Sequence, residues 1–142
     1  MRTLNDVLTT VPKQWGGLIA GLFLGLVAVS VGLILPSEME REFFAMLLFG
    51  IATIYLGFAV ADGRPREIAI EVTVIVVFGL LALGGLWFAP VLLVIGYFAH
   101  GIWDVVHHPH GVQTSIRRWY PPFCLVVDWV ISVYLLGWLL TS

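Results

Sequence analysis

Residues 90–110 read PVLLVIGYFAHGIWDVVHHPH, and the remainder of the chain is best understood in relation to this stretch. Its first ten residues are apolar enough for the interior of a bilayer. Its second half carries His100, Asp104, His107 and His108. At about 100° per residue, the first three fall within an arc of roughly 60° on one helix face, with His108 at the edge. Ionisable side chains inside a membrane span are costly and mark functional sites, so we predict a polar site on this helix.

The composition indicates an integral membrane protein. Of the 142 residues, 60% are hydrophobic and 11% are charged, whereas a soluble domain carries roughly 25% charged residues. The net charge of −2 comes without any basic stripe, so we expect no nucleic-acid partner. The single cysteine, Cys124, excludes a disulfide within the chain.

Five long apolar segments, separated by proline, glycine or charged residues, predict five membrane-spanning helices in one domain, residues 1–142. Helices satisfy every backbone hydrogen bond within lipid, and these runs are too long and too uniformly apolar for barrel strands. We therefore expect a compact all-α bundle. Ala89 and Pro90 form a very short turn, so spans three and four should be an antiparallel hairpin of helices. The predicted spans are residues 15–35, 43–61, 67–88, 90–108 and 123–140.

Six of the seven basic residues fall on one side of this predicted topology. The other side holds only Arg41. The positive-inside rule then predicts a cytoplasmic N-terminus and an external C-terminus, in a multi-pass protein of a plasma membrane or a bacterial inner membrane. The basic residues on the predicted cytoplasmic side are Arg2, Lys13, Arg64, Arg66, Arg117 and Arg118.

Acidic residues of the neighbouring spans are predicted to lie at the depth of the polar helix face. With a rise of 1.5 Å per residue, His100 lies roughly 13 Å and Asp104 roughly 7 Å inside the boundary at Pro109. By the same rise, Glu71 lies about 6 Å inside span three and Asp128 roughly 8–9 Å inside span five. These depths all fall in the cytoplasmic leaflet, so we predict one polar site shared by three helices.

This combination of side chains favours metal binding. Imidazole and carboxylate groups three or four residues apart on helices suit zinc, iron or manganese. A site with an open position activates water or dioxygen beside a lipid-phase substrate, so as an enzyme the protein would be a metal-dependent intramembrane hydrolase or oxygenase that modifies lipids. The predicted catalytic residues are Asp104, Glu71 and Asp128, and the predicted metal ligands are His100, Asp104, His107, His108, Glu71 and Asp128.

The pattern H-x-x-x-D-x-x-H-H over residues 100–108 resembles the histidine boxes of membrane desaturases and hydroxylases. The resemblance covers one helix and implies a metal-binding role for these histidines. Those enzymes carry more histidines over a longer chain, so a complete two-metal centre of that type is not expected. A haem site would lack a second axial histidine, because all four histidines lie within residues 100–110.

Other interpretations remain open. A small ion, proton or solute transporter would also place Asp, Glu and His inside a bundle, although it should need polar groups across both leaflets. A non-catalytic accessory subunit could turn the same residues toward a partner. Each candidate also has a structural explanation. His107 and His108 could be solvated, and Glu71 and Asp128 could pair with arginine. His100 and Asp104 could form a structural hydrogen bond between helices.

Two further patterns concern packing. Gly17, Gly21 and Gly25 form a stripe of small residues that lets another helix approach closely, within the bundle, in a homodimer or against a partner membrane subunit. On the fifth span, Cys124, Asp128 and Ser132 lie on one stripe at i, i+4 and i+8. Trp103, within the polar helix, could wall the site or face lipid, and we favour lipid.

Overall fold

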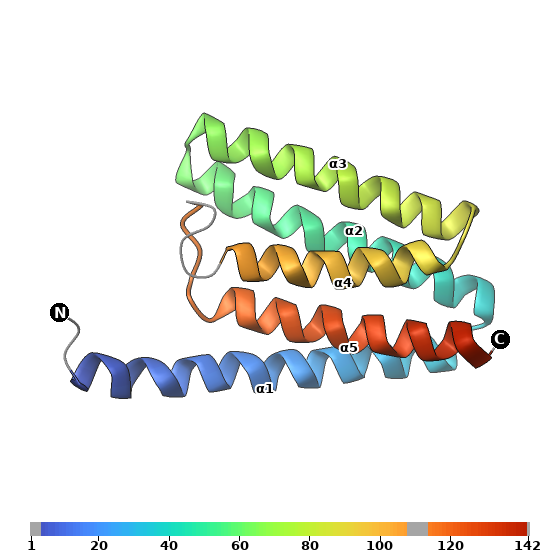
Figure 1. The fold of residues 1–142 in the computed structure, drawn as a ribbon, viewed down its shortest axis with the longest axis horizontal. Coiled ribbons are helices and arrows are strands. Elements are labelled where there is room, and N and C mark those ends of the chain that lie inside the picture. The colour runs from blue at the N-terminus through green and yellow to red at the C-terminus, as the bar shows by residue number, and fades with distance from the viewer. Residues whose placement is uncertain (1–3, 108–113, 142) are drawn as a thin grey trace.

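The computed structural model describes residues 4–107 and 114–141, with side chains from residue 15 onward. Within these ranges, every element is an α-helix. The predicted compact all-α bundle is therefore confirmed (Figure 1). The helices are α1 (Leu4–Ile34), α2 (Ser37–Asp62), α3 (Pro65–Trp87), α4 (Val91–Val106) and α5 (Tyr120–Thr141).

Four of these helices are long and apolar enough to cross a membrane: residues Trp15–Ile34 of α1, and all of α2, α3 and α5. Helix α4 has 16 residues and measures about 24 Å, which is shorter than the hydrocarbon core of about 30 Å. It ends at Val106, before the predicted limit at residue 108. The number of membrane crossings and the orientation of the termini stay predictions.

Helix α2 begins six residues before the predicted span, because the SEMERE segment at 37–42 is helical rather than a loop. The acidic side chains of Glu38 and Glu40 lie in its first turn, where they complement the positive end of the helix dipole. At the other end, Gly63 adopts a left-handed conformation with φ of 78° and closes the helix. Pro65 then occupies the first turn of α3, a position that needs no backbone N–H donor.

Helix α4 lies at the centre of the bundle. It packs against α2, α3 and α5, while α1 lies along α5 on the outside (Figure 1). Helices α3 and α4 form the predicted antiparallel hairpin. Along α4 one stripe is buried and includes Leu93, Tyr97, His100 and Asp104. Phe98 and other large apolar side chains face outward, as expected for a helix that meets lipid.

The glycine stripe holds α1 against α5 of the same chain. A Cβ atom on Gly17 would lie 2.7 Å from the carbonyl oxygen of Trp119, and one on Gly21 would overlap the carbonyl oxygen of Phe123. At Gly25 a Cβ would lie 3.0 Å from a side-chain carbon of α5. The stripe therefore serves packing within the bundle. Association with a second copy or with a partner subunit stays a prediction.

Candidate metal centre

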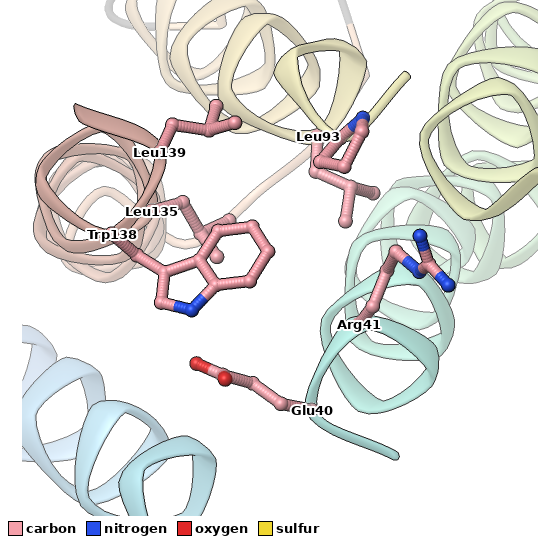
Figure 2. A pocket seen from close by; sticks show the side chains of 7 residues that line it. Glu40, Arg41, Leu93, Leu135, Trp138 and Leu139 are labelled. Carbon is pink, nitrogen blue, oxygen red and sulfur yellow. The ribbon is translucent and has the colours of Figure 1, made fainter. Parts of the chain in front are cut away.

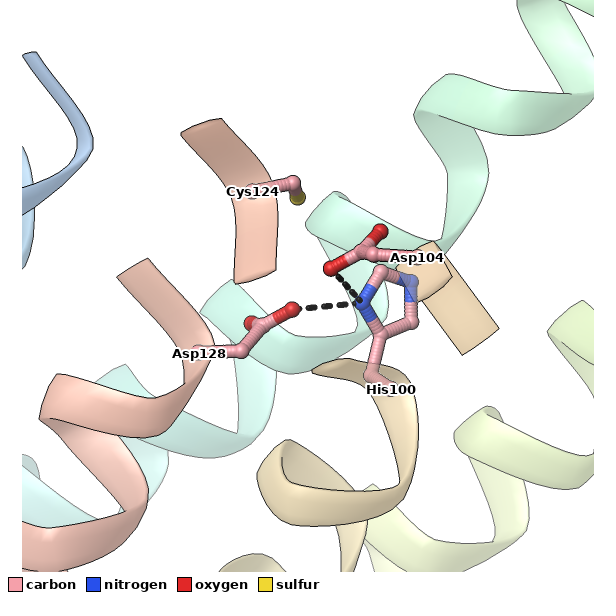
Figure 3. A group of neighbouring side chains, drawn as sticks. All are labelled: His100, Asp104, Cys124 and Asp128. Carbon is pink, nitrogen blue, oxygen red and sulfur yellow. Dashed lines mark hydrogen bonds and ion pairs between the residues drawn. The ribbon is translucent and has the colours of Figure 1, made fainter. Parts of the chain in front are cut away.

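Helices α4 and α5 bring four potential metal ligands together (Figure 3). His100 and Asp104 lie one turn apart on α4, and Cys124 and Asp128 lie one turn apart on α5. One ligand atom from each residue lies within 4.8 Å of the other three. Each of the four residues is at most 2% exposed. The sequence-based expectation that His100, Asp104 and Asp128 meet at one depth agrees with this arrangement.

Within this four-residue cluster, the imidazole of His100 is the central group. Its Nδ1 lies 2.7 Å from Oδ2 of Asp128 and 3.9 Å from Oδ2 of Asp104. The contact between Nδ1 and Asp128 holds one proton, carried either by Nδ1 or by the carboxyl group of Asp128. A metal ion that binds to Nδ1 would replace this proton and would meet both carboxylates.

Several polar atoms of the cluster have no hydrogen-bond partner among the residues that the structure describes. They are Nε2 of His100, Oδ2 of Asp104 and Oδ1 of Asp128. A buried polar atom without a partner costs roughly 1–3 kcal/mol, and more when it is charged. Two carboxylates that lie this close inside an apolar bundle therefore need either shared protons or a cation.

The donor set fits a transition metal. Thiolate and imidazole ligands suit zinc and iron, and the carboxylates also suit manganese. Bonds of about 2.0–2.3 Å in tetrahedral zinc sites place ligand atoms about 3.3–3.8 Å apart. The four ligand atoms, which lie within 4.8 Å of one another, would have to close by about 1 Å around an ion.

Cys124 was not among the ligands predicted from sequence. The signal was present, because Cys124 and Asp128 share the i, i+4 spacing of His100 and Asp104. Ser132, the third member of that stripe, donates to the carbonyl oxygen of Val94 at 3.1 Å. Its role is therefore to join α5 to α4.

Glu71 and His107 form a separate pair outside the four-residue cluster. Nε2 of His107 lies 2.7 Å from Oε1 of Glu71, and its Nδ1 lies 3.0 Å from the carbonyl oxygen of Trp103. Since that carbonyl can only accept, Nδ1 carries a proton. The contact with Glu71 therefore holds a second proton, either on an imidazolium or on the carboxyl group. Thr114 approaches the same carboxyl oxygen at 3.5 Å, and His108 lies outside the described residues.

Tyr55 of α2 lies between the cluster and the Glu71–His107 pair. Its hydroxyl donates to Oδ1 of Asp104 at 2.5 Å. Its ring stacks on that of His107, with centroids 4.2 Å apart and planes 20° apart. No signal in the sequence pointed to this role of Tyr55, since nothing in α2 alone indicates which neighbour its hydroxyl contacts.

Comparison with protein families adds one match. A model described as "Family of unknown function (DUF6010)" matches residues 16–139. The chain belongs to this family. The DUF6010 match includes all four residues of the cluster, together with Tyr55 and the Glu71–His107 pair. Neither the curated proteins nor the solved structures gave a match to the chain.

In this DUF6010 protein, the polar groups thus form two units of different chemistry. The cluster offers nitrogen, oxygen and sulfur donors to an ion, and the Glu71–His107 pair holds an exchangeable proton at the same end of the bundle. Tyr55 contacts both units.

Proposed function

We propose that this DUF6010 protein is an integral membrane metalloprotein with one transition-metal ion bound by His100, Asp104, Cys124 and Asp128. The observation that carries the proposal is the meeting of four buried donors from two helices within 4.8 Å. A divalent ion would offset most of the negative charge of the two carboxylates and the Cys124 thiolate, which is otherwise expensive inside a membrane. Zinc and iron fit the donors best because of the thiolate, with manganese third.

We further propose that the metal acts on a lipid-phase small molecule, as a hydrolase or an oxygenase. Four protein ligands are typical of structural zinc, whereas catalytic sites keep one position open. Catalysis would therefore require one protein ligand to leave or a fifth coordination position. Asp104 and Asp128 would hold the ion, and Glu71 with His107 would take up or supply the proton. The membrane would be a plasma membrane or a bacterial inner membrane.

Metal analysis tests the proposal. The purified chain, loaded with zinc, iron or manganese and then desalted, should retain about one ion per chain. His100→Gln, Asp128→Asn and Cys124→Ser should each lower the retained metal at least about tenfold. Ser132→Ala is the matched control, because it removes a buried polar group one turn from Asp128 without touching the cluster. A folded wild type that retains no metal, or variants that retain as much as wild type, would support the accessory-subunit alternative.

A proton or ion pathway is the second candidate, because Glu40 is buried in the first turn of α2 (Figure 2), far along the helix from Tyr55. Glu40 accepts a hydrogen bond from Tyr134 at 2.5 Å. Between Glu40 and Tyr55, however, the buried stripe of α2 consists of apolar residues that include Phe44 and Leu48, both fully buried. We therefore favour the metal site. Proton or ion flux into liposomes that Glu71→Gln abolishes would reverse this preference.

A further inference from the structure

Helices α3 and α4 leave an apolar groove on the outer surface of the bundle. Its volume is about 240 Å³. Val77 and Ile102 on its rims are 50% and 46% exposed. Since this surface faces lipid in a membrane bundle, the groove is open to the bilayer. Thr73, Val74, Val77, Phe78, Ile102 and Trp103 are among its lining residues.

The groove reaches the walls of both polar units. The ring of Phe78 meets the ring of His100 edge-on with centroids 4.8 Å apart, and the ring of Trp103 meets that of His107 in the same manner at 4.9 Å. One layer of aromatic rings thus separates the groove from the site. Trp103 is half-buried and does both things considered from the sequence, because it lines the lipid-facing groove and its ring also contacts His107.

The groove continues along α3 to a cationic side chain, that of Arg66. A shallow depression on α3 shares Thr73 and Val74 with the groove and ends at Arg66. The side chain of Arg66 is 76% exposed. It contacts Oε1 of Glu67 at 3.1 Å, yet its exposure leaves the guanidinium open to a second anion, and guanidinium groups bind phosphate in a bidentate manner. Along the helix axis, Arg66 lies about 18 Å from Phe78.

Trp103, one of the lining residues, carries a polar group without a partner among the described residues. Its indole Nε1 is buried and has no hydrogen-bond partner in the described ranges, although an indole N–H normally finds an acceptor when it is buried. Val74, on the opposite wall, lies about 12 Å from Arg66 along α3. An ester carbonyl is a hydrogen-bond acceptor, and in a lipid it lies between the headgroup and the acyl chains. In a lipid whose phosphate binds at Arg66, the carbonyl would therefore lie deeper than Arg66, toward Trp103.

We propose that this groove binds an anionic glycerophospholipid, with its phosphate at Arg66, an ester carbonyl facing Trp103 and an acyl chain lying over Phe78. The groove then presents the acyl chain, rather than the headgroup, to the wall of the metal site. As a statement about substrate, this rests on the function proposed above. Binding itself does not require the metal, so the two proposals can be tested separately.

Photo-crosslinking in nanodiscs tests the groove. The full chain is placed in phosphatidylcholine nanodiscs that contain a small fraction of phosphatidylglycerol with a diazirine in its acyl chain, and the crosslinked residues are mapped by mass spectrometry. We expect crosslinks concentrated at Val77, Phe78 and Ile102. A phosphatidylcholine probe with the same diazirine should give at least about fivefold fewer. Arg66→Gln should lower the phosphatidylglycerol signal to the level of the neutral probe.

A pair of bulky substitutions on α3 supplies the control. Val77→Trp fills the groove and should abolish the crosslinks, whereas Leu80→Trp adds the same side chain at an exposed position outside the groove and should leave them unchanged. Metal content is measured in the same samples. Crosslinks that are spread over the apolar surface, equal for both lipids or unaffected by Val77→Trp would overturn the proposal that the groove binds this lipid. Groove crosslinks on a protein that binds no metal would uphold the groove and refute the metal site instead.

Discussion

Nδ1 of His100 lies 2.7 Å from Oδ2 of Asp128, and this contact joins α4 to α5 inside the bundle. Both side chains are fully buried. The contact carries a proton when the site is empty of metal, on Nδ1 or on the carboxyl group, because two acceptors without a proton would repel each other. An ion that binds between the two residues must displace that proton, so metal binding and proton release are coupled.

This coupling predicts a pH dependence. Because His100, Cys124 and the carboxylates bind metal in their deprotonated forms, the apparent metal affinity should rise with pH. The release of one proton gives about a tenfold rise in affinity per pH unit, and the release of two gives about a hundredfold rise. Competition with a chelator of known affinity between pH 5.5 and 8 measures the slope. An affinity that does not change with pH would contradict displacement of the proton between His100 and Asp128.

Tyr55→Phe should weaken both the fold and the metal site. The substitution removes the hydroxyl that donates to Asp104 and keeps the ring that stacks on His107. We expect a loss of about 1–3 kcal/mol in the free energy of unfolding and a loss of about 10–100-fold in metal affinity. Thermal unfolding and chelator competition measure the two effects.

Tyr97→Phe is the control for this substitution, because the buried hydroxyl of Tyr97 donates to the backbone carbonyl of Phe44, away from the metal ligands. It should lower stability and leave metal affinity unchanged. Equal losses of affinity in the two variants would mean that Tyr55 acts only through general packing.

Glu71→Gln should leave the metal content unchanged. Glu71 was predicted from sequence as a ligand, but the structure pairs it with His107 outside the four-residue cluster. The amide keeps the shape of the side chain and removes the exchangeable proton, so turnover of a lipid substrate should fall while one ion per chain remains. Loss of the ion in Glu71→Gln would show that Glu71 moves into the first coordination sphere.

The close contact between α1 and α5 predicts a strong effect of a single substitution. In Gly21→Val, the new Cβ would overlap the backbone carbonyl oxygen of Phe123, and backbone cannot move aside as a side chain can. We expect a loss of about 1–3 kcal/mol of stability. Gly50→Ala is the control, since nothing lies within 4 Å of its Cβ position; there the better helix propensity of alanine should leave the stability equal or higher. Unfolding temperatures in detergent compare the two variants.

Periodicity was sufficient to predict the face of α4 correctly. His100 and Asp104 are fully buried on one stripe, as the 100° rotation per residue requires. The depth argument placed Asp128 beside them, as in the structure. Such reasoning works in a membrane protein, where the bilayer fixes the ends of the helices. It also placed Glu71 there, whereas the structure pairs Glu71 with His107, because depth does not give the direction in which a side chain points.

The partition of the polar residues into two units could not be predicted in this way. His107 lies at the C-terminal end of α4 and meets Glu71 of α3, while Asp104 faces α5. Where α4 ends decides whether the side chain of His107 meets α3 or α5. Sequence patterns do not give the end of a helix to within a few residues. The bonds of Tyr55 depend on the rotation of α2, which its nearly uniform apolar sequence leaves undetermined.

X-ray absorption spectroscopy at the edge of the bound metal tests the central claim most directly. If the ion is bound by His100, Asp104, Cys124 and Asp128, the first shell should contain one sulfur at about 2.3 Å with the remaining nitrogen and oxygen ligands at about 2.0–2.2 Å. Cys124→Ser should retain less metal, and the ion that it still holds should lack the sulfur contribution and keep the nitrogen and oxygen ligands. A first shell without sulfur, a spectrum that Cys124→Ser leaves unchanged, or a folded chain that retains no ion would contradict the site.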